Sequence, residues 1–187
     1  MRTSFDILDM PIQGLRLLQR NPIGDDRGYF ERIFCSEELG SLIPGKTLVQ
    51  INYTLTAKRG TVRGMHFQYP PHAETKLVSC LRGKVLAVAV DLRYGSPTFL
   101  HWHAEILSAD NHKTFVIPEG FAHGFQALTG DCGMLYLHTA AYMVEAEGGL
   151  NASDPRLAIR WPLAIAEQSV RDSTHPLIAE DFSGVIV

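Results

Sequence analysis

Two stretches of this 187-residue chain combine histidine with glycine and other polar residues at spacings that suit chemistry. The first reads Arg-Gly-Met-His-Phe-Gln from Arg63 to Gln68, and Lys76 follows it. Side chains alternate between the two faces of a strand, so His66 and Gln68 share one face, and Arg63 joins them only if Gly64 marks a bulge. An imidazole titrates near neutral pH, so His66 could move a proton without a cofactor. The alternative is an ordinary core or surface histidine.

The second stretch reads Pro-Glu-Gly-Phe-Ala-His-Gly-Phe from Pro118 to Phe125. Pro118 and Gly120 predict a rigid turn that sets where the next strand begins. His123 then lies near the start of that strand between small residues, which let a backbone or a ligand approach closely. The pattern Pro-x-Gly-x-x-His resembles the second signature of the cupin superfamily.

The first stretch differs from the other cupin signature at one informative position. That signature is a glycine, five residues, then His-x-His and a glutamate. Gly60 and His66 fit it, and Glu74 follows at a looser spacing. Gln68 stands in place of the second histidine, and glutamine is a poorer ligand for a divalent metal. The chain therefore resembles a cupin jelly roll that has lost its metal site, and we expect neither a metal nor another cofactor.

A third group, His101, His103 and Glu105, alternates along a predicted strand. A period of two places all three on one face, which is a possible set of metal ligands. The simpler interpretation is that the apolar residues between them form the buried face while the polar side chains face water. We expect the solvated face.

Two further groups have candidate roles. Tyr136 and Tyr142 could act as general acids if a nearby cation lowers the phenol pKa, although single tyrosines more often pack in a core. Between Asp26 and Glu31 the chain combines charge, glycine and aromatic residues. Arg27 could bind phosphate and Phe30 could stack on a flat base, or the segment is an ordinary turn into a strand.

Short apolar or alternating segments must position these residues. Turn signals separate the segments about every 8–12 residues, the spacing typical of a β-sandwich or barrel rather than a doubly wound parallel sheet. The predicted strands are 48–54, 76–81, 84–92, 98–107, 113–117, 121–128 and 134–139. No linker-like change of composition interrupts the chain, so we expect a single domain over residues 1–187.

The segment 76–92 predicts a hairpin, because two valine-rich strands flank Gly83, which can adopt the positive φ of a tight turn. Helix signals are few. Ser36 is predicted to cap a short helix that Gly40 ends. A second short helical stretch is expected over 164–168.

Charge and composition exclude several classes of protein. Seventeen Lys and Arg against twenty Asp and Glu give a net charge of −3, which argues against a nucleic-acid binder but allows a local basic pocket. The longest useful apolar run, 85–90, is far shorter than the roughly 20 residues of a membrane span. Three widely spaced cysteines fit a reducing cytoplasm better than a disulfide framework.

Taken together, the motifs resemble the dTDP-4-dehydrorhamnose 3,5-epimerase family in order and spacing. They comprise 26–31, Gln50 with Asn52, 63–68, 76–78, 88–91, 107–111, 118–125 and 161–163. The resemblance implies an all-β, cupin-type jelly-roll barrel or sandwich with a few short helices, acting as a cofactor-independent homodimer. The implied reaction inverts carbon 3, carbon 5 or both in a nucleotide-linked 4-keto-6-deoxy sugar, and the family's name points to a dTDP-sugar.

The resemblance also implies roles for individual residues. His66 matches the family's base, Asp172 its carboxylate partner, and Tyr136 the acid on the opposite face of the sugar. Lys76 and His123 match catalytic-pocket positions. The matched substrate-contact positions are Arg27, Phe30, Glu31, Gln50, Asn52, Arg63 and Tyr142. The chain departs from the family's usual Lys, Tyr and Pro at Leu137, Ala141 and Val144.

Two other functions remain open from the sequence. A related cupin 3,4-ketoisomerase would act on the same class of sugar, but it typically carries a second histidine where Gln68 stands. A non-enzymatic sugar- or metal-binding cupin would use His101, His103 and Glu105. For the homodimer, the resemblance implies exchange of an N-terminal strand, for which 5–8 and 15–18 are the candidates.

Overall fold

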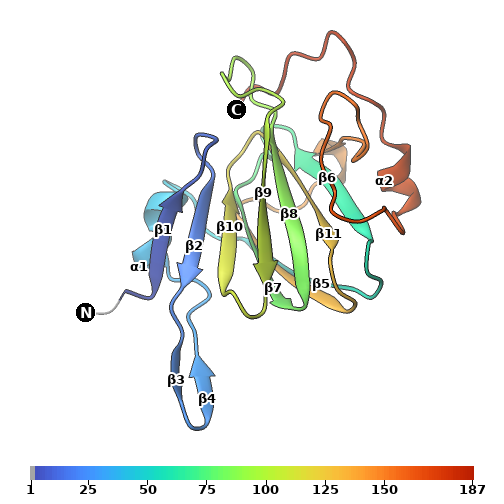
Figure 1. Ribbon diagram of the computed structural model, residues 1–187. Coiled ribbons are helices and arrows are strands. Elements are labelled where there is room, and N and C mark those ends of the chain that lie inside the picture. The colour runs from blue at the N-terminus through green and yellow to red at the C-terminus, as the bar shows by residue number, and fades with distance from the viewer. Residues whose placement is uncertain (1–2) are drawn as a thin grey trace.

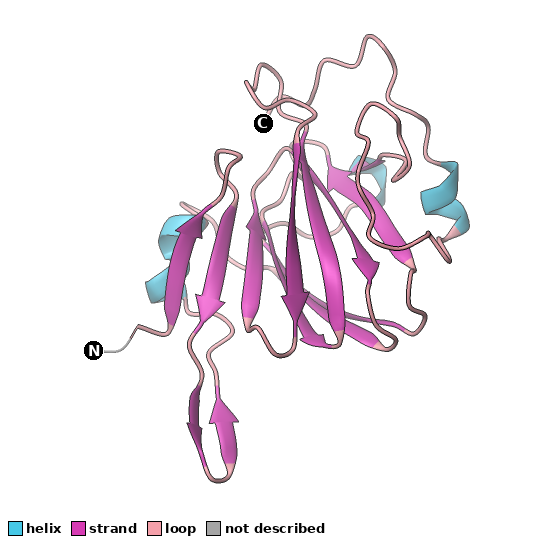
Figure 2. Cartoon of the chain, in the orientation of Figure 1, coloured by secondary structure: helices cyan, strands magenta, loops and turns pink. Residues whose placement is uncertain are grey.

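The structure is a computed structural model that describes residues 3–187, and two facing β-sheets make up most of it (Figure 1). The six-stranded sheet has the order β1-β2-β10-β7-β12-β5, and the five-stranded sheet has the order β13-β6-β11-β8-β9. Only short helices accompany the strands (Figure 2). The all-β prediction with a few short helices is confirmed.

The strands are short and follow one another closely along the chain. Their bounds are β1 Phe5–Asp9, β2 Arg16–Arg20, β3 Ile23–Asp25, β4 Gly28–Phe30, β5 Gln50–Thr56, β6 Val62–Gln68, β7 Lys76–Arg82, β8 Lys84–Asp91, β9 Trp102–Ser108, β10 Lys113–Ile117, β11 Phe121–Ala127, β12 Cys132–His138 and β13 Glu147–Gly149. The helical segments are α1 Ser36–Leu39, α2 Val170–Thr174 and the 3-10 turns Gly40–Leu42 and Val144–Ala146. Each predicted strand has a counterpart within a few residues.

The segment 76–92 does not form the predicted hairpin. β7 belongs to the six-stranded sheet and β8 to the five-stranded sheet, so the two strands are not paired with each other. Gly83 has the expected positive φ of 76°, and a Cβ there would meet Thr129 Oγ1 at 2.6 Å. The tight turn therefore takes the chain from one sheet to the other. Turn chemistry alone does not distinguish this corner from a hairpin, because both need the same backbone conformation.

Apolar side chains fill three layers. The central core lies between the sheets and includes Val78, Phe115, Phe125 and Met134. A second cluster covers the outer face of the five-stranded sheet with the C-terminal segment, and a third packs α1 and its following turn against the six-stranded sheet. Burial on both faces explains why β7, β8 and β11 read as nearly continuous apolar runs.

The helix predictions need correction. Helix α1 lies where it was expected, but its N-cap residue is Cys35 rather than Ser36, and Gly40 has a right-handed φ of −58° and begins a 3-10 turn. Residues 164–168 are extended. Ala166 donates its backbone N–H to Gly60 and Glu167 accepts from Val62, so this stretch borders the start of β6. The nearby helix is α2 instead, because pairing with β6 satisfies the backbone of 164–168.

The bulge at Gly64 that the sequence left open is present. β11 pairs His123 with His66 and Phe125 with Arg63, so one residue of β11 lies opposite two residues of β6. Gly64 has a φ of 118°, and a Cβ there would meet Gly124 Cα at 2.6 Å. The extra residue turns Arg63 to the same side of the sheet as His66, as the sequence suggested.

The N-terminal region extends beyond the two sheets. The β3–β4 hairpin projects away from them, and β1 forms the outer edge of the six-stranded sheet (Figure 1). Within residues 3–187, no helix is both long and apolar enough to cross a membrane.

Candidate active site

A cavity of about 750 Å³ opens between the two sheets. One wall comes from β5, β7 and β12, and the other comes from β6, β11, the segment 167–169 and α2. The predicted residues that line it are Asn52, Arg63, His66, Lys76, His123, Tyr136, Tyr142 and Asp172. Chain segments more than one hundred residues apart therefore meet in one space.

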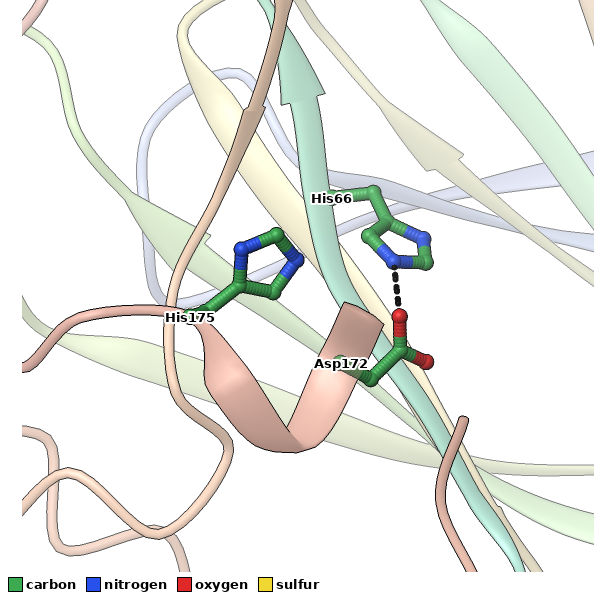
Figure 3. A group of neighbouring side chains, drawn as sticks. All are labelled: His66, Asp172 and His175. Atoms are coloured by element: carbon green, nitrogen blue, oxygen red, sulfur yellow. Dashed lines mark hydrogen bonds and ion pairs between the residues drawn. The ribbon is translucent and has the colours of Figure 1, made fainter. Parts of the chain in front are cut away.

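His66 and Asp172 form an imidazole–carboxylate pair on the wall made by β6 and α2. His66 Nε2 lies 2.8 Å from Asp172 Oδ1 (Figure 3). Asp172 Oδ2 accepts the Gly64 N–H at 3.1 Å. Burial opposes ionisation of Asp172, but the bonds from His66 and Gly64 outweigh it and hold the carboxyl pKa well below its usual range. A carboxylate only accepts, so Nε2 carries the hydrogen and Nδ1 is the nitrogen that can take a proton.

Local sequence explains where Asp172 lies. Ser169 caps α2, and its Oγ accepts the backbone N–H of Asp172 at 3.0 Å. This bond fixes Asp172 in the first turn, where its side chain is 3% exposed beside β6. Serine is a favoured cap because its oxygen satisfies a free N–H of the first turn.

His175 and Arg171 surround this pair. Donor atoms of His66, Asp172 and His175 lie within 4.8 Å of one another, a group that could hold a metal ion (Figure 3). However, Arg171 Nη2 lies 3.3 Å from His66 Nε2, and Arg171 Nε lies 3.6 Å from Asp172 Oδ1. A metal cation there would meet the guanidinium charge at close range. These three side chains therefore suit proton transfer better than metal binding.

Tyr136 lies on the opposite wall, on β12. Burial raises the pKa of its phenol to about 12, although the positive charge of Arg63 opposes that rise. Its ring lies edge-on to His123, with centroids 6.1 Å apart. A phenol with so high a pKa keeps its proton at neutral pH and can donate it to a stronger base.

Lys76 is a buried cation with a nearby counterion. Its Nζ lies 3.2 Å from Glu74 Oε1 and 3.2 Å from the backbone oxygen of His66. The same carboxylate binds His138 Nδ1 through Oε2 at 2.7 Å. Burial works against ionisation of Glu74, but His138 and Lys76 outweigh it and lower the carboxyl pKa. The floor of the cavity thus holds an ionic network of three residues.

His123 is the most enclosed imidazole of the site. Burial, with a contribution from the charge of Lys76, holds its pKa well below the usual value, so it is neutral near pH 7. Its Nε2 is buried without a hydrogen-bond partner among the described residues. A buried polar atom of this kind is costly unless something else satisfies it, as a bound ligand would.

The predicted contact residues on β5 and beyond β12 lie near the opening. Tyr142 is 51% exposed and donates its hydroxyl to Glu147 Oε2 at 3.0 Å. Gln50 accepts the Tyr142 N–H and donates to Asn52, but Gln50 itself is not part of the cavity lining. Gln50 therefore supports the opening without facing the cavity.

Gln68 ties two chain segments together. Its amide donates to the backbone oxygens of His72 and Ala141 and accepts the N–H of Met143. Three bonds from one side chain tie the segment after β12 to the end of β6. Leu137 faces away from the cavity and packs in the α1 cluster, and Val144 is 62% exposed.

Besides Gln50, three predicted substrate residues lie outside the cavity of their own chain. Arg27 pairs with Asp25 on the β3–β4 hairpin, and Phe30 is 67% exposed. Glu31 binds His112 Nδ1 at 2.9 Å and lies 3.4 Å from Arg20 Nε. The structure of one chain therefore gathers the predicted residues of the barrel, except Gln50, but not those on or next to the hairpin.

The solvated-face prediction for β9 is wrong for two of its three residues. His103 and Glu105 are partly buried, bind each other at 3.0 Å, and lie opposite Ala89 and Ala87 on β8, whose side chains face the central core. Lys113 Nζ lies 3.6 Å from Glu105. His101 is exposed and precedes the strand, since a turn bonded to Asp91 occupies the residues before Trp102. An edge strand can bury polar residues when they pair with one another.

Several site residues were not predicted from the sequence as functional. Glu74, His138, Arg171 and His175 all lie in or beside the cavity or the His66 pair. The sequence could have indicated His138, because it lies two residues after Tyr136 on the same strand and therefore shares its face. Glu74, Arg171 and His175 lie in loops or a short helix, where periodicity carries no information.

Comparisons with known proteins agree with this geometry. The family model described as dTDP-4-dehydrorhamnose 3,5-epimerase matches residues 9–180. A curated dTDP-4-dehydrorhamnose 3,5-epimerase of Sinorhizobium fredii is 41% identical over 172 residues, which cover 91% of this chain and 88% of the relative.

Solved structures show the same similarity. A Legionella pneumophila dTDP-6-deoxy-D-glucose-3,5-epimerase, in complex with dTDP-4-keto-L-rhamnose, has a TM-score of 0.88 and 38% identity, covering 92% of each chain. A Bacillus anthracis dTDP-4-dehydrorhamnose 3,5-epimerase with TDP and PPi bound has a TM-score of 0.90 and 37% identity, covering 94% of this chain and 100% of the other. These neighbours confirm the cupin-type fold that the motifs predicted.

Proposed function

The chain belongs to the dTDP-4-dehydrorhamnose 3,5-epimerase family, and from that premise we propose that the cavity between its sheets is the active site, with His66 as base and Tyr136 as acid. The protein is an epimerase that inverts carbon 3, carbon 5 or both in a nucleotide-linked 4-keto-6-deoxy sugar. The observation that supports these two roles is that His66 and Tyr136 come from facing sheets and line the same cavity.

Proton removal begins the reaction. A C–H bond beside a ketone is acidic because the resulting anion spreads onto the ketone oxygen as an enolate. His66 Nδ1 takes that proton, and the ring becomes an imidazolium whose Nε2–H already points at Asp172. The ionised carboxylate then stabilises the new positive charge, as carboxylates paired with catalytic imidazoles do.

Lys76 stabilises the enolate oxygen in this proposal. Its ammonium is buried, so its field is weakly screened by water, and Glu74 and the His66 carbonyl hold it in place. A preorganised donor at a developing oxyanion typically contributes about 10²–10³ in rate. Charge stabilisation of this kind needs no group beyond the side chains of the chain.

Tyr136 completes the inversion. It donates its proton to the enolate carbon from the wall that faces His66, so the new C–H bond forms on the face opposite the broken one. The phenol is protonated at neutral pH because burial raises its pKa to about 12. Proton donors of this type contribute about 10²–10⁴.

Exposed basic residues at the cavity opening suit the nucleotide diphosphate. Arg63, Lys58 and Arg171 line the cavity and are exposed, whereas His123 and Lys76 lie buried on its floor. Arginine guanidinium groups bind phosphate oxygens through paired hydrogen bonds. The proposal therefore directs the sugar inward and the diphosphate toward the opening.

Solvent deuterium uptake tests the proposed function. The purified protein is incubated in D₂O with dTDP-4-keto-6-deoxyglucose, and NMR reads deuterium at the two carbons beside the ketone. We expect incorporation with inversion at carbon 3, carbon 5 or both. If neither position of this or any related nucleotide 4-keto sugar exchanges, the proposal fails.

We also propose that the protein is a homodimer in which the N-terminal region completes the partner's site. Alternate apolar side chains on and before the edge strand β5 are about half exposed or more: Val49, Ile51, Tyr53 and Leu55. A contiguous exposed apolar stripe favours burial against another protein surface, here a second copy. The projecting hairpin carries Arg27 and Phe30 outward, which supports contact with the cavity of that copy.

Subunit complementation tests this arrangement. H66N and Arg27→Ala are each expected to be weakly active, but mixed subunits would contain one site free of both changes. Activity should return on mixing if Arg27 serves the partner's cavity, and it should stay low if each chain uses its own hairpin. A hydrodynamic mass near 20.8 kDa, instead of twice that value, would contradict the dimer.

The proposed location is the cytoplasm. Cys35, Cys80 and Cys132 are free thiols, and two of them are buried. Free cysteines are typical of a reducing compartment, which supports this location.

A further inference from the structure

The cavity contains a second imidazole–carboxylate pair that the mechanism above does not use. His138 Nδ1 lies 2.7 Å from Glu74 Oε2, and their side chains are 11% and 8% exposed. The pair lies on the β7–β12 side of the cavity, whereas His66 and Asp172 lie on the β6–α2 side. The two pairs have similar bond lengths, 2.7 Å and 2.8 Å.

Strand geometry directs His138 to the same side as Tyr136. The two residues are two positions apart on β12, so they share a face. Their rings are nearly parallel, with an interplanar angle of 17° and centroids 6.1 Å apart. Both residues line the cavity. A substrate ring held between the walls would therefore meet the phenol and the imidazole on the same face.

Hydrogen bonding defines which nitrogen of His138 can exchange a proton. Glu74 is ionised and only accepts, so His138 Nδ1 carries a hydrogen. The other nitrogen, Nε2, accepts from Asn52 Nδ2 at 3.3 Å, because Asn52 Oδ1 is already turned toward Gln50. That contact is at the long end for a hydrogen bond and therefore weak, and Nε2 gives it up when it takes on the proton that it donates. Asn52 lies on β5, directly opposite Tyr136 on β12, and also lines the cavity.

Given the proposed function, we infer that His138, oriented by Glu74, is a second proton donor of the pocket and serves one of the two carbons that flank the ketone. Tyr136 serves the other carbon. The geometry supports a division of labour because two donors side by side can reach two positions on one ring. A single phenol would otherwise have to serve both.

The step balances in protons and electrons. His66 removes a proton from carbon, and the C–H electron pair moves into the enolate. Protonated His138 then gives its Nε2 hydrogen to the same carbon from the other face, the enolate electrons restore the ketone, and His138 becomes neutral. After the product leaves, His66 releases its proton to solvent and His138 takes one up. Glu74 keeps the ring in place throughout through Nδ1.

The alternative is that the Glu74–His138–Lys76 network only stabilises the fold. The variant His138→Asn separates the two functions, because an asparagine amide can still donate to Glu74 but cannot deliver a proton. We expect its melting temperature to stay within a few degrees of the wild type. Inversion at one carbon should fall by about 10²-fold or more, the usual contribution of an acid–base group, while inversion at the other carbon changes little.

Isotope exchange supplies the decisive readout. In H138N, His66 still removes the proton and returns a deuteron from the same side, so one carbon should exchange without inverting. H101N is the matched control, because His101 is exposed and precedes β9, and we expect it to behave as the wild type. Equal losses at both carbons, no loss at either, or a wild-type protein that inverts only one carbon would overturn the inference.

If H138N does not fold, a second variant tests the same inference. Glu74→Gln keeps an oxygen that accepts from His138 Nδ1 but removes the carboxylate charge beside both His138 and Lys76. Because Lys76 serves the enolate at either carbon, exchange should fall at both carbons, while inversion relative to exchange should fall further at the carbon that His138 serves. An unchanged ratio of inversion to exchange at both carbons would overturn the inference. A wild-type protein without any exchange would instead contradict the proposed function, so the two failures are distinguishable.

Discussion

The two walls of the cavity hold their acid–base groups in different environments. On the β6–α2 wall, His66 is 25% exposed at its side chain and its partner Asp172 comes from a segment 106 residues away. On the β7–β12 wall, Tyr136, His138, Lys76 and Glu74 lie on or next to neighbouring strands of one sheet. On the first wall His66 reaches water and its partner comes from a distant segment, whereas the groups of the second wall are more enclosed and come from paired strands.

This difference suits the two halves of an inversion. A base that must release its proton between turnovers benefits from contact with solvent, and His66 has that contact. A donor must keep its proton until the enolate forms, and burial raises the pKa of Tyr136 to about 12. The base on one wall therefore reaches solvent, and the proton donor on the other wall is shielded from it. Variants on each wall test this difference.

The largest effect is expected for His66→Asn on the open wall. This variant lacks the base, so both inversion and deuterium exchange should fall by about 10⁴-fold, the upper end for an acid–base group. The measurement is NMR detection of deuterium at both carbons beside the ketone. Appreciable exchange in this variant would mean that another group removes the proton.

Tyr136→Phe on the enclosed wall should separate exchange from inversion. Inversion at the carbon that Tyr136 serves should fall by about 10²–10³-fold, while exchange there continues because His66 is intact. Comparing deuterium content with product configuration checks this. If exchange and inversion decline together, Tyr136 and His66 do not act on opposite faces.

Asp172→Asn weakens the open wall without removing its base. Loss of the carboxylate that stabilises the imidazolium should lower kcat by about 10²-fold. Asp172 has a depressed pKa in the folded protein, so its contribution to stability is present above the unfolded pKa of about 4 and is lost as the pH falls through the folded value. The stability gap between wild type and variant should therefore be largest near pH 7 and shrink in acid.

Urea unfolding at several pH values measures this difference in the free energy of unfolding between the wild type and Asp172→Asn. A hydrogen bond to a charged group contributes about 1.5–3 kcal/mol, which sets the expected difference near pH 7. Asp91 provides a matched control, because burial opposes its ionisation but bonds from Arg93, Ser96 and Thr98 lower its pKa to about 2. Asp91→Asn should show a similar pH dependence of stability without the loss of kcat.

The smallest effect is expected for Arg171→Gln at the rim of the open wall. Arg171 is 52% exposed at its side chain and pairs with Glu147 at 2.8 Å. Exposed ion pairs contribute about 0.2–1 kcal/mol, so kcat should fall less than about tenfold, whereas loss of the proposed diphosphate contact should act on KM. A much larger loss of kcat in steady-state kinetics would show that Arg171 takes part in the chemistry beside His66.

Prediction from sequence worked best where a residue lies on a strand. The strand that carries Tyr136 and the shared face of His66 and Gln68 follow from a period of two, and the glycine at position 64 indicated where a bulge could bring Arg63 beside His66, as it does. The expected hairpin at Gly83 was wrong because a tight turn can connect two strands of one sheet or of two sheets. Local sequence does not distinguish these outcomes.

Prediction was weakest where the site depends on loops and long-range pairing. The extended stretch before α2 looked helical, but its backbone pairs with the start of β6. Glu74 has no periodic signal, and its importance follows only from its contact with Lys76 and His138. Asp172 was identified through resemblance to a family, since nothing in its own neighbourhood points to a partner 106 residues away.

The sequence alone determined the all-β class, the positions of most strands and the residue types that can move a proton, because alternation and turn chemistry are local properties. Only the tertiary structure decided that His66 meets Asp172, that Tyr136 and His138 share one wall, and that the hairpin with Arg27 lies away from its own cavity. These facts depend on which sheet each strand joins. That choice is made by the burial of apolar faces across the whole chain, which no short segment contains.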